Sequence, residues 1–160
     1  MSLSLSTARQ GFWHCPHPDS PAHNSAPRTI PTTDCPFCRI DPRRILAESD
    51  LALTLRDGFP VSPGHTLVIP RRHFAALFDA TPEELAALWR ALLAAADGLV
   101  RDGGADGFNL GVNVGAAAGQ TVMHLHVHLI PRYAGDQVDP RGGIRRIFPE
   151  LADYWSAPRP

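Results

Sequence analysis

The pattern of apolar and polar residues predicts five short β-strands, of which residues 51–55 and the histidine segment alternate as half-buried strands do. An Asp57-Gly58 turn and a Pro-Gly loop ending at His65 separate the second and third of them. The predicted strands cover residues 45–48, 51–55, 66–69 and 108–114, with the fifth inside 119–131. The small-residue loop 115–119 joins the last two, which therefore predict an antiparallel hairpin.

One segment has the period of a helix instead. Thr81 is a predicted N-cap, Pro82 suits the first turn, and Glu84 completes a capping box. Apolar residues then recur every three or four positions, at Leu85, Leu88, Trp89, Leu92, Ala96 and Leu99, until Asp102-Gly103-Gly104 ends the helix. We interpret Trp89 as a core residue and not as a platform for base stacking. Meandering strands with one long helix indicate an α+β fold.

Composition separates the first 33 residues from the rest. They are rich in Ser and Pro and lack a sustained apolar period, so we predict a flexible tail followed by one domain over residues 34–160. The cluster Trp13-His14-Cys15-Pro16-His17, with His23 beyond, is open to two further interpretations, a metal site or a segment that packs on a partner subunit.

The net charge of −1 does not indicate binding to nucleic acid or to an anionic membrane surface. No apolar run approaches the roughly 20 residues that span a bilayer. The N-terminus also lacks the pattern of a secretory signal. We therefore expect a cytoplasmic protein that binds neither nucleic acid nor a membrane.

Three histidines at alternate positions are the most informative chemistry in the chain. A strand would point His124, His126 and His128 to one face, about 6.5 Å apart, and would send the intervening Leu and Val residues to the other. Neutral imidazole is a nucleophile, a proton carrier or a metal ligand. The alternative is a structural row of partly solvated histidines.

Cys35-Pro36-Phe37-Cys38 has the spacing of a zinc half-site, in which two thiolates on a tight turn bind one ion. Three cysteines are a poor disulfide framework. The competing interpretation is a redox C-x-x-C in a thioredoxin-like fold. That fold needs a helix at the motif, and Pro36 and Pro42 argue against one.

Residues 35–133 resemble the histidine triad family of nucleotide hydrolases and transferases, and most closely its bacterial diadenosine polyphosphate hydrolase-like members. The resemblance rests on the His-x-His-x-His strand with its Gly-Gln turn, on the helix, and on the loop that ends Pro63-Gly64-His65. It implies that His126 attacks the α-phosphorus and that His128 contacts the phosphate or the leaving group. It also implies that substrate is bound by Asn113, Gly119, Gln120 and Thr121, with Gln120 assisting catalysis.

Three further residues have both a functional and a structural interpretation. The resemblance places Asp57 on the ribose hydroxyls, whereas an Asp-Gly turn explains it equally well. His65 matches a nucleotide-site histidine or closes its loop. Arg132 steers phosphates or is a solvated residue at a strand end.

The resemblance also implies a closed, structural zinc site made of Cys35, Cys38, His73 and His124. It implies a homodimer and a purine nucleotide substrate. We therefore expect a hydrolase of dinucleoside polyphosphates or nucleoside phosphoramidates that works through a nucleotidyl-histidine. The alternatives are a nucleotide-binding regulatory protein with incidental hydrolysis, and a metalloenzyme that uses all three strand histidines.

Overall fold

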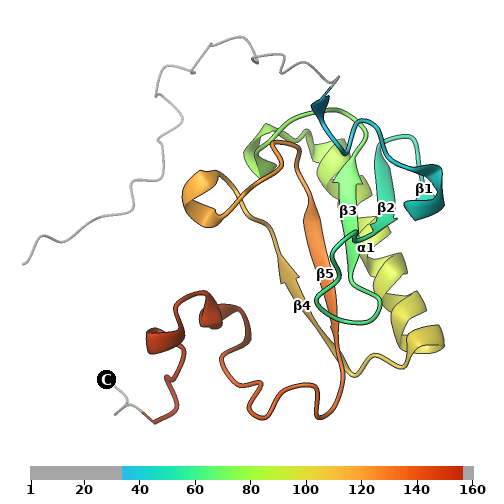
Figure 1. The fold of residues 1–160 in the computed structure, drawn as a ribbon. Helices are drawn as coiled ribbons and strands as arrows, with labels where there is room; N and C mark the ends of the chain where they lie inside the picture. The colour runs from blue at the N-terminus through green and yellow to red at the C-terminus, as the bar shows by residue number, and fades with distance from the viewer. Residues whose placement is uncertain (1–33, 157–160) are drawn as a thin grey trace, which may run out of the picture. The chain divides into compact units, whose positions relative to one another are not determined.

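The computed structural model describes residues 34–156, which form a five-stranded antiparallel sheet with one long helix on it (Figure 1). The sheet order is β1-β2-β3-β5-β4, and the expected α+β fold class is confirmed. The strands are β1 (Ile45–Glu48), β2 (Ala52–Arg56), β3 (Thr66–Pro70), β4 (Gly107–Gly111) and β5 (Val127–Arg132), and the helix is α1 (Pro82–Gly103). The predicted tail, with its cluster of residues 13–17 and His23, lies outside the described residues.

Short 3-10 helices connect these elements and make up part of the C-terminal segment. They are η2 (Pro42–Arg44), η3 (Leu77–Asp79), η4 (Ala116–Ala118), η5 (Gly143–Ile147) and η6 (Pro149–Leu151). No helix of the described residues is both long and apolar enough to cross a membrane.

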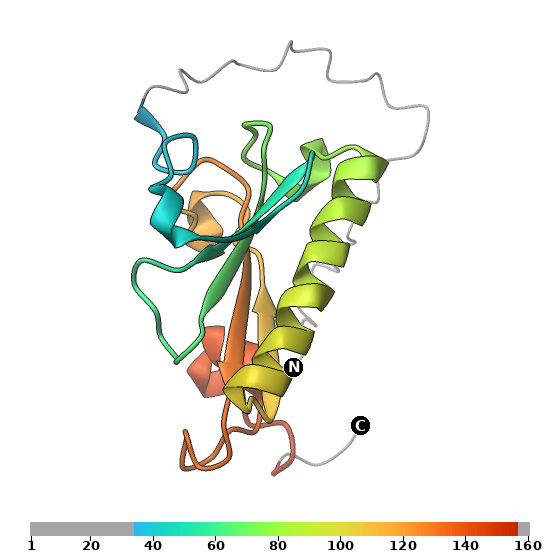
Figure 2. The ribbon, with the colours of Figure 1, turned by 90° about the vertical axis from the view of Figure 1, so that its right-hand side faces the viewer.

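The two faces of the sheet are buried by different parts of the chain. Figure 2 shows α1 along one face, with the segment that precedes β1 on the other. On the helix face, Leu88 and Leu92 of α1 pack with Val68 of β3 and with Leu125. The opposite face is closed by a second cluster, which consists of Leu53, Leu55, Leu67 and Ile69 with Phe37, Ile40 and Ile45 packed against it. The strands therefore alternate between two separate apolar layers.

The histidine segment joins the sheet later than the sequence predicts. β5 begins at Val127, so only His128 of the three histidines lies in the strand. Before that point the chain bends at residues 122–124 and has a different partner, because the N–H of Leu125 donates to the carbonyl of Phe74. The preceding strand is also shorter than predicted, since β4 ends at Gly111, which is opposite His128. The antiparallel pairing of β4 with β5 is confirmed.

The start and the end of α1 follow the predicted signals. The Thr81 hydroxyl accepts from the N–H of Glu84, and the Glu84 carboxylate accepts from the N–H of Thr81, which is a complete capping box. Arg72 donates two hydrogen bonds to the same carboxylate at 2.9 and 2.8 Å, so Glu84 is buried but fully paired. The helix ends at Gly104, whose left-handed φ of 64° glycine adopts without steric cost.

The interpretation of Trp89 as a core residue is wrong. Its side chain is 58% exposed, and Leu85 is 41% exposed, whereas the buried residues of α1 are Glu84, Ala87, Leu88 and Leu92. The buried stripe is thus rotated away from the predicted one, because α1 turns its alanine-rich side toward β2 and β3. Trp89 instead lines an apolar groove of about 430 Å³ with Leu77, Leu85, Ala86, Leu88, Leu92, Val112 and Val127.

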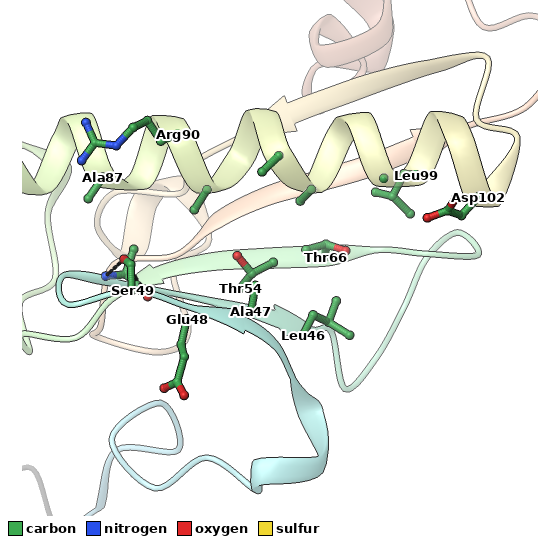
Figure 3. Close-up of a pocket in the computed structure, with 15 residues that line it drawn as sticks. Leu46, Ala47, Glu48, Ser49, Thr54, Thr66, Ala87, Arg90, Leu99 and Asp102 are labelled. Carbon is green, nitrogen blue, oxygen red and sulfur yellow. Dashed lines mark hydrogen bonds between the residues drawn. The ribbon is translucent and has the colours of Figure 1, made fainter.

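A larger cavity of about 590 Å³ separates α1 from the strands β1 to β3 (Figure 3). Small side chains of the helix, such as Ala87, form one wall, and Thr54 and Thr66 belong to the facing strands. This cavity is on the helix face of the sheet, whereas His128 pairs with Leu67 of the opposite layer. It is therefore separate from the histidine chemistry.

We expect Leu88→Ala to lower the free energy of unfolding by about 2–4 kcal/mol, because Leu88 is 4% exposed within the helix-face cluster. Leu93→Ala is the matched control on the same helix. Leu93 is 50% exposed, so its loss should cost roughly 0.5 kcal/mol or less. Urea denaturation followed by circular dichroism measures both, and equal losses would contradict the packing described.

Candidate active site and metal centre

The three histidines lie on the face of the chain opposite Leu125 and Leu129, which are both fully buried. His124 and His126 precede β5, and His128 is the second residue of the strand. The ring centroids of His126 and His128 are 5.1 Å apart. The predicted alternation is therefore present, although the first two histidines precede the strand.

One hydrogen bond fixes the protonation of the His126 ring. Its Nδ1 is 2.8 Å from the carbonyl oxygen of His124, and a carbonyl can only accept. In the neutral ring, Nδ1 must carry the proton and Nε2 must carry the lone pair. The ring is 7% exposed, with the Phe37 ring 5.2 Å away on one side. His126 is thus held with one nitrogen available as a nucleophile.

A second histidine pair lies next to it. His65 Nε2 is 3.0 Å from His128 Nδ1, and the Asp57 carboxylate lies 3.5 Å from the first atom and 4.0 Å from the second. Burial lowers the pKa of His65, against the opposing effect of Asp57. Burial also lowers the pKa of His128, and the neighbouring His126 and His65 add to this effect. Both rings are therefore neutral at pH 7.

Asp57 has the turn role that its sequence context allowed, and its second carboxylate oxygen faces the histidines. Its Oδ1 accepts a 2.7 Å hydrogen bond from the N–H of Phe59, which is the local bond of an Asp-initiated turn. Its Oδ2 faces His65 and His128. The turn thereby aims one carboxylate oxygen into the histidine cluster. A contact with ribose hydroxyls stays a prediction.

The structure brings together the four residues implied as metal ligands. One candidate ligand atom from each of Cys35, Cys38, His73 and His124 lies within 4.8 Å of the others. The distances between Cys38 Sγ and the two histidines are 3.1 Å to His73 Nδ1 and 3.6 Å to His124 Nδ1. The turn between the cysteines is closed by a backbone bond from Cys38 N–H to the Cys35 carbonyl.

Two observations show that these residues fit a metal ion. His124 Nε2 is 2.9 Å from the carbonyl oxygen of Pro70, so it carries the proton and leaves the Nδ1 lone pair facing the thiols. Burial, with the neighbouring Cys35, raises the pKa of the Cys38 thiol to about 11. Two adjacent thiolates therefore need a cation between them, and two sulfur and two nitrogen donors are a set that suits zinc.

The Gln120 side chain has a structural role in this conformation. It is buried, and its amide nitrogen donates to the carbonyls of Ala75 and Val122 at 2.9 and 3.2 Å. Its oxygen accepts from the N–H of Gly115. Both amide protons are thus occupied, and Gln120 braces the loop before the histidines. Its predicted part in catalysis requires that one of these bonds be exchanged for substrate.

The remaining predicted substrate residues surround this loop. Gly119 has a left-handed φ of 81°, and a Cβ built there would meet no atom within 4 Å. Thr121 is exposed, and Asn113 lies two residues beyond Gly111, the strand partner of His128. Their contact with substrate stays a prediction.

Arg132 is not solvated freely at the strand end. It donates to both carboxylate oxygens of Asp136, at 2.7 and 2.8 Å, and to Asn109 Oδ1 at 2.6 Å. A guanidinium paired in this way is a poor candidate for steering phosphates.

Sequence reasoning missed the position of Phe37. Its ring contacts both His124 and His126 edge-on, at centroid distances of 5.9 and 5.2 Å, and it also packs on the second apolar cluster. The residue lies within the Cys-x-x-Cys motif, whose spacing indicates a metal site and says nothing about the intervening side chains. The available signal was that an aromatic side chain on a tight turn must be buried somewhere.

Comparison with known proteins agrees with this geometry. The family model described as the HIT domain matches residues 39–135. The chain is 39% identical over 117 residues to the adenylylsulfatase HINT3 of Arabidopsis thaliana, covering 71% of this chain and 59% of that protein. It therefore spans less than two thirds of that relative. It is also 33% identical over 132 residues to the AP-4-A phosphorylase of Mycobacterium tuberculosis, covering 81% of this chain and 67% of the relative.

A solved structure shares the fold. It is a Zn-bound histidine triad family protein from Mycobacterium smegmatis, with a TM-score of 0.62 and 36% sequence identity. The match covers 68% of this chain and 81% of that one. Because the HIT domain model covers more than half of the sequence, the chain belongs to the HIT domain family.

Proposed function

We propose that this protein is a nucleotide hydrolase that cleaves at the α-phosphate of dinucleoside polyphosphates or nucleoside phosphoramidates. The observation that carries the proposal is the bond from His126 Nδ1 to the carbonyl of His124. It leaves a lone pair on Nε2 of a neutral ring, which is the state that a nucleophile needs. The named relatives, an adenylylsulfatase and an AP-4-A phosphorylase, support a reaction at a nucleotide.

The reaction takes place in two displacements. His126 Nε2 forms a bond to the α-phosphorus while the bond to the leaving group breaks, and Nδ1 keeps its proton on the His124 carbonyl. Water then attacks the phosphorus, releases the nucleoside monophosphate and returns Nε2 to its original state. The proton lost by that water leaves with product or solvent. A covalent intermediate replaces one difficult displacement of an anionic ester by two easier ones.

The residues beside His126 support such a reaction. His128 adjoins its ring and is suited to contact the phosphoryl oxygens, because a donor that faces developing charge stabilises the transition state. The exposed Thr121 adds a hydroxyl near the turn, and Gly119 keeps the backbone of the turn open to substrate. Phe37 excludes water from one side of the nucleophile.

We expect His126→Ala to lower the rate of nucleotide release by at least about 10³-fold, because the variant lacks the attacking nitrogen. The assay separates products from diadenosine polyphosphates and from adenosine phosphoramidates by chromatography, with water alone and with added inorganic phosphate. AMP in both cases would indicate water as the acceptor, and ADP with phosphate present would indicate phosphorolysis. Acid-quenched wild-type protein should carry one nucleotidyl group by mass spectrometry, and His126→Ala none.

Two outcomes would overturn this proposal in different ways. Release that survives His126→Ala but disappears with a chelator would show a catalytic metal. No release from either substrate class, together with tight binding of nucleotide, would show a regulatory nucleotide-binding protein.

We propose further that Cys35, Cys38, His73 and His124 hold one zinc ion. The geometry of the four ligand atoms and the Zn-bound relative from Mycobacterium smegmatis support it. A site with four protein ligands is closed to activated water, so the ion stabilises the fold and takes no part in the reaction. It would tie the turn before β1 to the segment that carries His126.

Purified protein should therefore contain one zinc ion per chain, and Cys35→Ser should remove it and lower the midpoint of thermal unfolding. His128→Asn is the matched control, because His128 belongs to the other histidine cluster and should leave the zinc content unchanged. Atomic emission spectrometry measures the metal. If zinc were lost in His128→Asn and kept in Cys35→Ser, the ion would be bound by Asp57, His65 and His128 and the proposed site would be refuted.

We also propose that two chains associate through α1 and β4. The groove around Trp89 exposes apolar side chains beside β4, which is an edge strand with no strand partner on its outer side within the described residues. Exposed apolar patches of this kind mark protein interfaces. A second copy of the chain would cover both features at once.

Light scattering should then give twice the chain mass of 17.4 kDa, and Trp89→Glu should shift the protein toward the monomer, because it places a charge in the groove. Phe59→Glu is the control, since Phe59 is 92% exposed outside that groove. A wild-type monomer at micromolar concentration would refute the interface.

A further inference from the structure

Nδ1 of His65 accepts a hydrogen bond from the chain itself. The N–H of Val61 donates to it at 3.3 Å, within a loop that the His65 N–H closes by donating to the Ser62 carbonyl at 3.0 Å. Two side chains hold this loop in place, because Ser62 donates to the Pro131 carbonyl at 2.6 Å and Tyr133 donates to the Pro63 carbonyl at 3.0 Å. The Val61 N–H is thus a fixed donor.

A fixed donor at Nδ1 decides where the proton of His65 must be. A neutral imidazole has one N–H and one lone pair, and the lone pair at Nδ1 is already occupied by Val61. The proton is therefore on Nε2. The ring is 4% exposed, so water has little access to its nitrogens and cannot readily replace these hydrogen-bond partners.

The Nε2 proton of His65 then decides the state of His128. Its nearest acceptor is Nδ1 of His128 at 3.0 Å, with the Asp57 carboxylate farther away at 3.5 Å. Nδ1 of His128 must accept, and the proton of His128 is therefore on Nε2, on the other side of the ring. The order of donors is Val61 N–H, His65 Nε2–H and His128 Nε2–H.

We propose that His65 is a positioning residue that locks His128 in the tautomer with its proton on Nε2, so that His128 presents a fixed hydrogen-bond donor to the phosphoryl group. This inference rests on the proposed function for the identity of the acceptor, but the tautomer itself is a property of the free protein. His65 needs no contact with substrate to act in this way. It acts through His128.

The same chain of bonds shows what His65 cannot do. If His128 gave its Nε2 proton to a leaving group, it could recover one at Nδ1 only from His65 Nε2. His65 would then become an imidazolate, because its other partner is a backbone amide that cannot supply a proton. The pair therefore donates hydrogen bonds and does not relay protons.

Removing the donor of His65 should reverse the tautomer of His128. Asp57 Oδ2 lies 4.0 Å from His128 Nδ1, and without His65 it is the acceptor that remains on that side. His128 would then place its proton on Nδ1, toward the carboxylate. Its Nε2 lone pair would face the phosphoryl oxygens and repel them.

The test compares His65→Gln with His65→Met. The Gln side chain keeps an N–H donor near the position of Nε2, whereas Met has a similar length and no donor. Long-range ¹H–¹⁵N correlation spectra of histidine-labelled protein report which nitrogen of His128 carries the proton, and they need no substrate. We expect protonated Nε2 in wild type and His65→Gln, and protonated Nδ1 in His65→Met.

Activity should follow the tautomer. His65→Met should lower kcat by about 10²-fold with little change in KM, because the lost interaction strengthens in the transition state, and His65→Gln should stay within roughly tenfold of wild type. Val138→Ala is the control, since its side chain is fully exposed and takes no part in this chain of hydrogen bonds. Zinc content and thermal midpoint verify that each variant is folded.

Two results would overturn the proposal. The first is a protonated Nδ1 on His128 in the wild-type spectrum, which requires no variant to fold. The second is an equal loss of kcat in both His65 variants with the His128 tautomer unchanged, which would show a structural role only. Failure of the hydrolase proposal is separate, because it would appear as nucleotide release that survives His126→Ala while the spectra of His128 stay as expected.

Discussion

The carbonyl of His124 organises the chemistry of this protein. It accepts the Nδ1 proton of His126 and so leaves the opposite nitrogen of that ring with its lone pair. The carbonyl is held in place because His124 is anchored at its side chain by the bond from Nε2 to the Pro70 carbonyl. A backbone group thus determines the protonation of a side chain two residues farther along the chain.

The rest of the fold holds that short segment in position. Leu125 on one side of it belongs to the helix-face cluster, and its N–H is bonded to the carbonyl of Phe74. On the other side, the turn of Cys35 and Cys38 places Phe37 against His126 and against the second apolar cluster. The proposed nucleophile, His126, therefore lies between two separately packed apolar layers, which limits the rotation of its ring.

Local patterns in the sequence predicted most of the architecture. The capping box at Thr81 and Glu84, the strand at 66–69 and the hairpin of the last two strands depend on neighbouring residues, and the structure has all of them. The exposure of Trp89 and the late start of β5 were not predictable in this way. They depend on which side of α1 meets the sheet and on the bond between Leu125 and Phe74, which are contacts between distant residues. In the site, the residue types were evident, whereas the bond from Val61 to His65 and the side-chain bonds of Gln120 involve geometry that no spacing contains.

The imidazole ring and the backbone carbonyl of His124 have separate roles. Its ring can bind a metal only as histidine, but its carbonyl is present in every amino acid. A descendant that lost the cysteines and replaced His124 would keep this carbonyl but would lose the side-chain bond to Pro70 that anchors it. The proposed metal site and the proposed nucleophile therefore both depend on His124, so a substitution of this residue would affect the two together.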